Sequence, residues 1–246
     1  MKRSVAALVV LLALLPAAGS QSEGDQGPDG ATVLVRIRIR GPIPGSRTTI
    51  VDRDKEACGQ TVTVRSAIVD PASRGVQDAA VWIDMSTVPQ TDPAMPASTE
   101  TEHKSPPSSL TNRACRFEPP VLLAQVGRQV EVRNDDAILH NTHIAGPDRT
   151  FLNVALPAGI SPVAKMMKAE GIYLVRCDAH PFMSATVVSL GHSLAGVTGR
   201  DGAARISGVP AGQYTVRVWH AALGTLRQTL TVPARGIVTV TLEYGE

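Results

Sequence analysis

Short runs in which apolar and polar residues alternate recur along this chain of 246 residues. In one of them Val33, Val35, Ile37 and Ile39 alternate with residues that include three arginines. A period of two is typical of a strand with one buried face. Long runs of helical periodicity are absent, and Gly and Pro recur throughout. We therefore predict an all-β chain, and because aromatic residues are only 3% of it, its cores must be aliphatic.

The stretch from Cys177 to Met183 reads Cys-Asp-Ala-His-Pro-Phe-Met and follows a predicted strand at 172–176. Thiolate, imidazole and thioether are soft ligands that suit copper. A blue-copper site needs two histidines and one cysteine, with a weak axial methionine, and this loop offers three of those four. His140, within the polar run 134–141, offers the second imidazole. A cysteine or histidine taken singly is as often structural, but the combination favours a copper site.

Residues 114–190 resemble the plastocyanin branch of the cupredoxins, because ligand types, ligand order and flanking strands all agree. The resemblance implies a Greek-key β-sandwich that holds one copper ion. It implies that His140, Cys177 and His180 are the equatorial ligands of that ion. Less directly, it implies Met183 as the axial ligand. It also implies that an electron leaves the metal through His180.

One spacing departs from the plastocyanin pattern. Two residues separate His180 from Met183, where plastocyanin-like loops usually have four. The shorter spacing is similar to that of the binuclear copper centre of oxidases, but the second loop cysteine of that centre is lacking here, so we predict a mononuclear site.

Two residues next to His140 receive different predictions. The resemblance implies that the main-chain N–H of Asn141 donates to the cysteine sulfur, which would tune the reduction potential. His143 lies three residues after His140, so in an extended strand it faces away from the site.

The first twenty residues combine Lys2 and Arg3 with a short apolar run and small residues, which predicts a secretory signal peptide at 1–20. The run is too short to span a bilayer. Its removal takes away two positive charges, so the formal net charge of +2 becomes 0. We therefore expect a secreted or periplasmic protein that binds neither nucleic acid nor an anionic membrane. Residues 21–30 are predicted to be a disordered leader.

The chain has three cysteines, and a secreted protein permits disulfides. If Cys177 binds metal, Cys58 and Cys115 remain to form a bridge. The alternative, a bridge between Cys177 and one of the other two, would remove the copper hypothesis.

The region after residue 190 contains an Asp-Gly turn at 201–202 and, at 209–216, the sequence Val-Pro-Ala-Gly-Gln-Tyr-Thr-Val. It resembles the carboxypeptidase regulatory-like (transthyretin-like) β-sandwiches, a resemblance that is specific for fold and nearly silent on function. The pattern of that family's opening strand is found upstream, at 75–82.

Two layouts of the chain follow from these resemblances. In the first, strands near 32–40, 61–69 and 79–85 pair with those of 203–244. A discontinuous sandwich (31–90 and 191–246) then surrounds a linker (91–106) and an inserted cupredoxin-like domain (107–190). In the rival layout, residues 31–190 form one enlarged cupredoxin and 192–246 a small appendage.

The expected function is a mononuclear copper protein that carries one electron to or from an unidentified redox protein. No acid–base pair indicates catalysis, so we expect a carrier rather than an enzyme. Two alternatives stay open: a structural or adhesive cell-surface module whose copper site is empty, and a copper storage or delivery protein.

Overall fold

The computed structural model describes residues 30–85 and 107–245. The predicted signal peptide, the leader up to residue 29 and the linker at 91–106 lie outside these residues. The described chain forms 18 strands and one short helix, which confirms the all-β prediction. No helix in this described part is long and apolar enough to cross a membrane.

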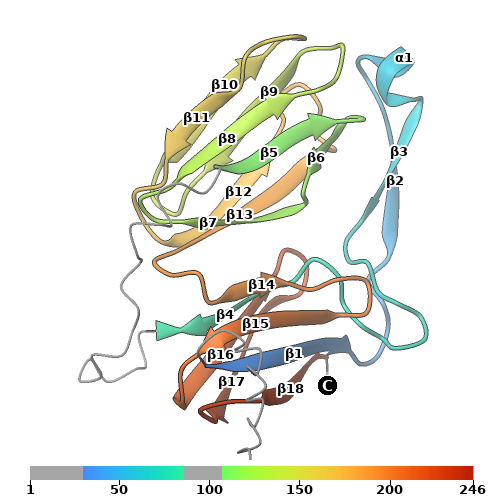
Figure 1. Cartoon of the computed structure of the whole chain (residues 1–246). Coiled ribbons are helices and arrows are strands. Elements are labelled where there is room, and N and C mark those ends of the chain that lie inside the picture. The colour runs from blue at the N-terminus through green and yellow to red at the C-terminus, as the bar shows by residue number, and fades with distance from the viewer. Residues whose placement is uncertain (1–29, 86–106, 246) are drawn as a thin grey trace, which may run out of the picture.

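The first sandwich is built from strands at both ends of the described chain, and it lies at the bottom of Figure 1. One sheet has the order β15 (Ala203–Val209), β1 (Ala31–Ile39), β18 (Ile237–Tyr244). The other has the order β14 (Ala195–Val197), β4 (Ala80–Asp84), β16 (Gly212–His220), β17 (Gly224–Val232). β1 pairs antiparallel with β15 and parallel with β18, and β4 pairs with β14 and β16.

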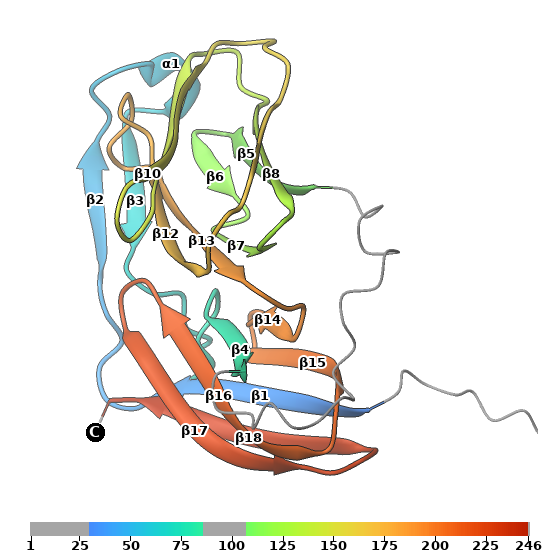
Figure 2. The ribbon, with the colours of Figure 1, turned by 90° about the vertical axis from the view of Figure 1, so that its left-hand side faces the viewer.

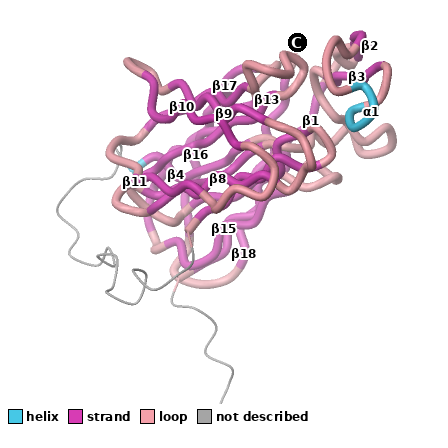
Figure 3. The backbone as a smooth tube through the Cα atoms, turned by 90° about the horizontal axis from the view of Figure 1, so that it is seen from above, coloured by secondary structure: helices cyan, strands magenta, loops and turns pink. Residues whose placement is uncertain are grey.

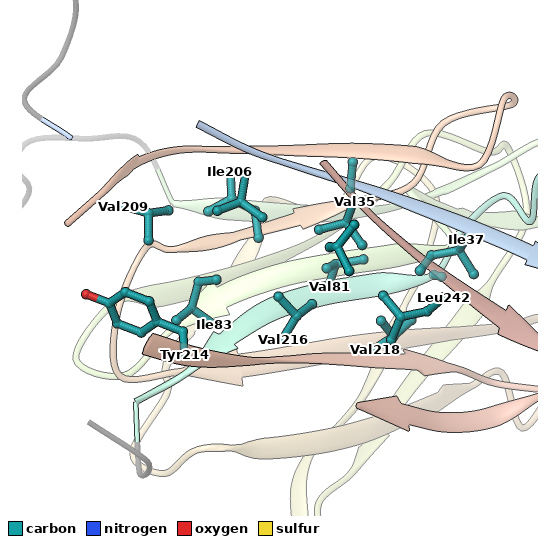
Figure 4. Packing of buried hydrophobic residues seen from close by; sticks show 14 of the residues in the cluster. Val35, Ile37, Val81, Ile83, Ile206, Val209, Tyr214, Val216, Val218 and Leu242 are labelled. Carbon is teal, nitrogen blue, oxygen red and sulfur yellow. The ribbon is translucent and has the colours of Figure 1, made fainter. Parts of the chain in front are cut away.

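Aliphatic side chains from these two sheets face one another and form the core of the first sandwich (Figure 4). The alternation that predicted the strand at 33–39 is realised, since its odd-numbered residues are buried and Arg36 and Arg38 are exposed. Other fully buried members come from β4, β15 and β16, namely Val81, Ile83, Ile206, Val209, Val216 and Val218.

The second sandwich contains the residues between 108 and 190. Its larger sheet has the order β10 (Thr150–Leu156), β9 (His140–Ala145), β12 (Gly171–Arg176), β13 (Ser184–Leu190), β7 (Val121–Gln125). Its smaller sheet has the order β11 (Val163–Met166), β8 (Gln129–Asn134), β5 (Ser108–Arg113), β6 (Arg116–Glu118). Figures 1 and 2 show it stacked on the first sandwich.

An apolar layer joins the two sandwiches. Trp82 of the first sandwich belongs to one buried cluster with Val121, Val188 and Leu190 of the second, and Trp219 packs against it. Since β13 ends at Leu190 and β14 begins at Ala195, the chain passes through this layer from one sandwich to the other.

A long two-stranded arm, residues 46–65, leaves the first sandwich and runs up beside the second (Figures 1 and 2). Seen from above, it lies at one side of the molecule (Figure 3). It consists of β2 (Ser46–Ile50), the helix α1 (Lys55–Cys58) at its tip and β3 (Thr61–Arg65). The prediction that the strand near 61–69 pairs with 203–244 is wrong, because β3 pairs only with β2. Its residues alternate between exposed and half-buried, so β3 has no fully buried face to complete a sandwich.

A disulfide fixes the tip of the arm to the second sandwich. Cys58, the last residue of α1, is bonded to Cys115 in the turn between β5 and β6. Cys58 packs against the apolar core of the second sandwich. The arm is therefore held to a surface far from the strands that carry it.

Candidate metal centre

The loop of residues 177–183, named the ligand loop for the metal ligands that it is predicted to carry, connects β12 to β13 at one end of the second sandwich. Cys177 directly follows β12, and Met183 directly precedes β13. Two main-chain hydrogen bonds close the loop, from Met183 N–H to the His180 carbonyl (2.9 Å) and from Cys177 N–H to the Met183 carbonyl (3.3 Å). The three side chains of the motif are thus gathered by a tight loop between paired strands.

His140 reaches the same place through strand pairing. It is the first residue of β9, which lies next to β12 with Arg176 opposite His143. This register puts the start of β9 beside the end of β12, where Cys177 lies. The antiparallel pairing of β9 with β12 therefore brings together two residues that are 37 positions apart in sequence, His140 and Cys177.

Three donor atoms converge in this corner. The distance from His140 Nδ1 to His180 Nδ1 is 3.2 Å, and the Cys177 Sγ atom lies 3.9 Å and 3.6 Å from these two nitrogens. A point at their centre lies about 2.1 Å from all three, close to metal–nitrogen distances of about 2.0–2.1 Å and metal–sulfur distances of about 2.3 Å. The triangle therefore has the size of a coordination plane.

All three donor side chains are enclosed. His140 is 0% exposed, and Cys177 and His180 are each 1% exposed. Met183 is also buried and belongs to the same apolar cluster as Cys177. A soft metal held here would be shielded from bulk water.

The residues flanking His140 lie as the sequence suggested. The Asn141 main-chain N–H donates to Cys177 Sγ at 3.3 Å. The imidazole of His143 is not among the three converging donors; it contacts Arg176 at 3.0 Å, Thr150 at 3.3 Å and Asp178 at 3.4 Å.

Asp136 holds the ring of His140 from behind. Its Oδ2 atom lies 2.8 Å from His140 Nε2 and also accepts the main-chain N–H of Cys115 at 2.9 Å. Burial works to raise the pKa of the Asp136 carboxyl, but hydrogen bonds from Cys115, His140 and Ala114 together hold that pKa below its ordinary value. The carboxylate is thus kept ionised as an acceptor, and with the proton on Nε2 the Nδ1 lone pair of His140 points into the donor triangle.

Burial also acts on His140 itself. It lowers the pKa of the imidazole below its ordinary value, an effect that Asp136 partly opposes and His180 reinforces. A neutral imidazole is the form that binds a metal ion.

His180 has a matching carboxylate from an unexpected part of the chain. Its Nε2 atom lies 3.0 Å from Oδ2 of Asp54, in the arm. His180, which the resemblance implied as the electron exit, is thus buried behind Asp54 and has almost no contact with solvent.

Sequence reasoning missed both carboxylates. Asp136 lies in the run 134–141 that was singled out for His140, so a search for acids near that histidine could have found it. Asp54 is 126 residues away from His180 in sequence, and no local pattern connects them.

The donor set suits copper. Two imidazole nitrogens and one cysteine sulfur match the trigonal His₂Cys set that copper prefers, and Met183 of the same loop is the candidate for its weak axial ligand. Hard ions such as Ca²⁺ and Mg²⁺ need oxygen ligands. The carboxylates of Asp136 and Asp54 contact the Nε2 atoms of the two histidines, on the side of each ring away from the donor triangle.

Comparisons with known proteins find similarity to part of the chain. No family model and no curated protein match the sequence. Among solved structures, the reduced state of an amicyanin mutant is similar at 23% identity over 34% of this chain and 82% of that chain, with a TM-score of 0.31. A purple cupredoxin from Nitrosopumilus maritimus is similar at 23% identity over 34% of this chain and 99% of that chain, with a TM-score of 0.30.

A copper-containing nitrite reductase from Thermus scotoductus is similar at 19% identity over 37% of this chain and 24% of that chain, with a TM-score of 0.31.

Proposed function

We propose that this protein binds one copper ion through His140, Cys177 and His180, with Met183 as a weak axial ligand, and that it carries one electron. The observation that supports this most directly is the convergence of two imidazole nitrogens and one cysteine sulfur on a point about 2.1 Å from each. When bound, the ion would supply reversible change between Cu(I) and Cu(II). The residues around it determine how easily that change occurs.

A pre-formed site suits electron transfer, because the ligands do not have to rearrange. The strands β9, β12 and β13 fix the two ends of the ligand loop and the start of His140's strand. The N–H of Asn141 places partial positive charge beside the sulfur, which favours the less positive metal and raises the reduction potential. Burial of the donors excludes water as an additional ligand.

The same enclosure argues for a carrier over the alternatives. A substrate would have to reach a metal whose ligating side chains are at most 2% exposed, so direct catalysis at the ion is disfavoured. Copper delivery needs an accessible ligand that a partner can replace, which this arrangement does not offer. A structural module with an empty site would need no convergent donors of this kind.

We also propose the interleaved layout, in which 31–90 and 191–246 form one sandwich around an inserted cupredoxin-like domain at 107–190. Its support is that β1 and β4 pair with strands that follow residue 194. By its sequence motifs the outer sandwich would be a carboxypeptidase regulatory-like domain, and its role would be to carry the arm. Export is supported by the Cys58–Cys115 bridge, since such bridges persist in oxidising compartments.

Copper titration of the purified protein tests the function. We expect one equivalent of Cu(II) to produce intense visible absorption from thiolate-to-copper charge transfer, and voltammetry to show a reversible one-electron wave. Cys177→Ser should abolish the colour. His143→Asn is the matched control, because this histidine lies near the site without facing it, and it should keep the colour.

Three results would contradict the proposal. If the wild-type protein binds no copper, the result would favour the alternative of a structural module with an empty site. If Cys177→Ser binds Cu(II) with an unchanged spectrum, the site lies elsewhere. Tight binding without a reversible wave would favour storage over electron transfer.

A further inference from the structure

Asp54 occupies an unusual position at the tip of the arm. Its backbone is left-handed, with φ 53° and ψ 39°. Such a conformation costs a non-glycine residue of the order of 1 kcal/mol or more and is often found at functional sites. Asp54 directly precedes α1, and its carbonyl oxygen accepts the N–H groups of Ala57 (3.0 Å) and Cys58 (2.8 Å).

The side chain of Asp54 does not perform the role that its position suggests. An aspartate before a helix usually accepts an N–H of the first turn with its carboxylate, but here the side chain makes no such bond. The carboxylate is directed instead at His180, with Oδ2 3.0 Å from Nε2. The strained backbone thus aims an acid at a ligand histidine rather than at its own helix.

The disulfide of the arm connects the contact between Asp54 and His180 with the contact between Asp136 and His140. Cys58, four residues after Asp54, is bonded to Cys115. The N–H of Cys115 donates to the Asp136 oxygen that also contacts His140. The two ends of the bridge therefore support two carboxylates, one behind each imidazole of the site.

We propose that Asp54 is a positioning residue of the copper centre, and that the arm is thereby part of that centre. This inference rests on the proposed function. The carboxylate accepts the Nε2–H of His180, which fixes the tautomer whose Nδ1 lone pair faces the donor triangle. Its negative charge stabilises Cu(II) relative to Cu(I), so it lowers the reduction potential. It also closes the edge of His180 to solvent and to foreign ligands.

The test uses variants that keep the left-handed backbone. Asparagine and glycine both accept a positive φ, so Asp54→Asn keeps an acceptor without the charge and Asp54→Gly removes both. Asp52→Asn is the matched control, since Asp52 is an exposed acid two residues away in the same arm. Each variant is compared with wild type for Cu(II) affinity, for reduction potential and, in the metal-free form, for the Nε2–H proton signal of His180.

We expect Asp54→Gly to weaken Cu(II) binding by about 10- to 100-fold, the usual effect of losing a carboxylate behind a ligand histidine. If Cu(I) binding is unchanged, each tenfold loss raises the potential by about 59 mV. Asp54→Asn should give a smaller rise, because the hydrogen bond remains. The slowly exchanging Nε2–H signal should persist in Asp52→Asn and disappear in Asp54→Gly.

Failure of this inference is distinct from failure of the proposed function. If the wild type shows the copper spectrum, but Asp54→Gly matches Asp52→Asn in affinity, potential and proton signal, then Asp54 has no positioning role and the copper site stands. If the wild type binds no copper, the function itself is wrong, and Asp54 has no metal centre to serve.

Discussion

The disulfide between Cys58 and Cys115 should contribute strongly to stability. It closes a loop with a sequence separation of 57 residues, for which the loop-entropy relation gives about 4 kcal/mol at 25 °C. The arm makes its main-chain ladder only within itself, and the bridge is its covalent attachment to the second sandwich. We therefore expect the double variant Cys58→Ala/Cys115→Ala to lose about 4 kcal/mol of unfolding free energy in the metal-free protein.

Denaturant unfolding measures this loss. Trp82 and Trp219 lie in the layer between the sandwiches, so their fluorescence reports the separation and unfolding of that layer. Cys177→Ala is the matched control, because it removes a buried sulfur without opening a loop. Thiol counting on the denatured, unreduced chain should give one free thiol in wild type and none in the control.

The size of the effect decides the outcome. A loss below about 1 kcal/mol, the net contribution of a single hydrogen bond, would show that the bridge does not constrain the unfolded chain as reasoned. A loss equal to that of Cys177→Ala would assign the effect to a missing buried sulfur instead. Three free thiols in wild type would show that the bridge does not form.

Three further predictions concern the metal-centre sandwich. Met183→Leu should keep the intense colour and raise the reduction potential, because losing an axial donor favours low-coordinate Cu(I); a lost colour or an unchanged potential in voltammetry would exclude the axial role. Asn134→Ala should cost about 1–3 kcal/mol in thermal or chemical unfolding, because its side-chain amide donates to the carbonyls of Ile138 and Leu156 at 2.8 Å each; a neutral effect would contradict this. The metal-free protein should become less stable as the pH falls below about 6.5, because burial lowers the pKa of His140 in the folded state and the unfolded chain then binds more protons. A melting temperature that is higher at pH 5.5 than at pH 7.5 would refute it.

The sequence determined the local features of this protein. Alternation with a period of two specifies which residues of a strand are buried, so the all-β class and the buried face of β1 could be read directly. The ligand loop could also be read, because Cys177, His180 and Met183 lie within one tight turn between strands. His140 needed only the assumption that its strand lies beside the loop, which the β9–β12 ladder provides.

Tertiary structure decided everything that depends on which strands meet. A period of two reports the faces of a strand but not its partner, so the sequence left two layouts open and wrongly paired the strand near 61–69 with the C-terminal region. The same limit hid Asp54, whose contact with His180 spans 126 residues. Only the folded arm, held by Cys58, brings that carboxylate to His180, because a hydrogen bond between distant segments leaves no periodic signal in either one.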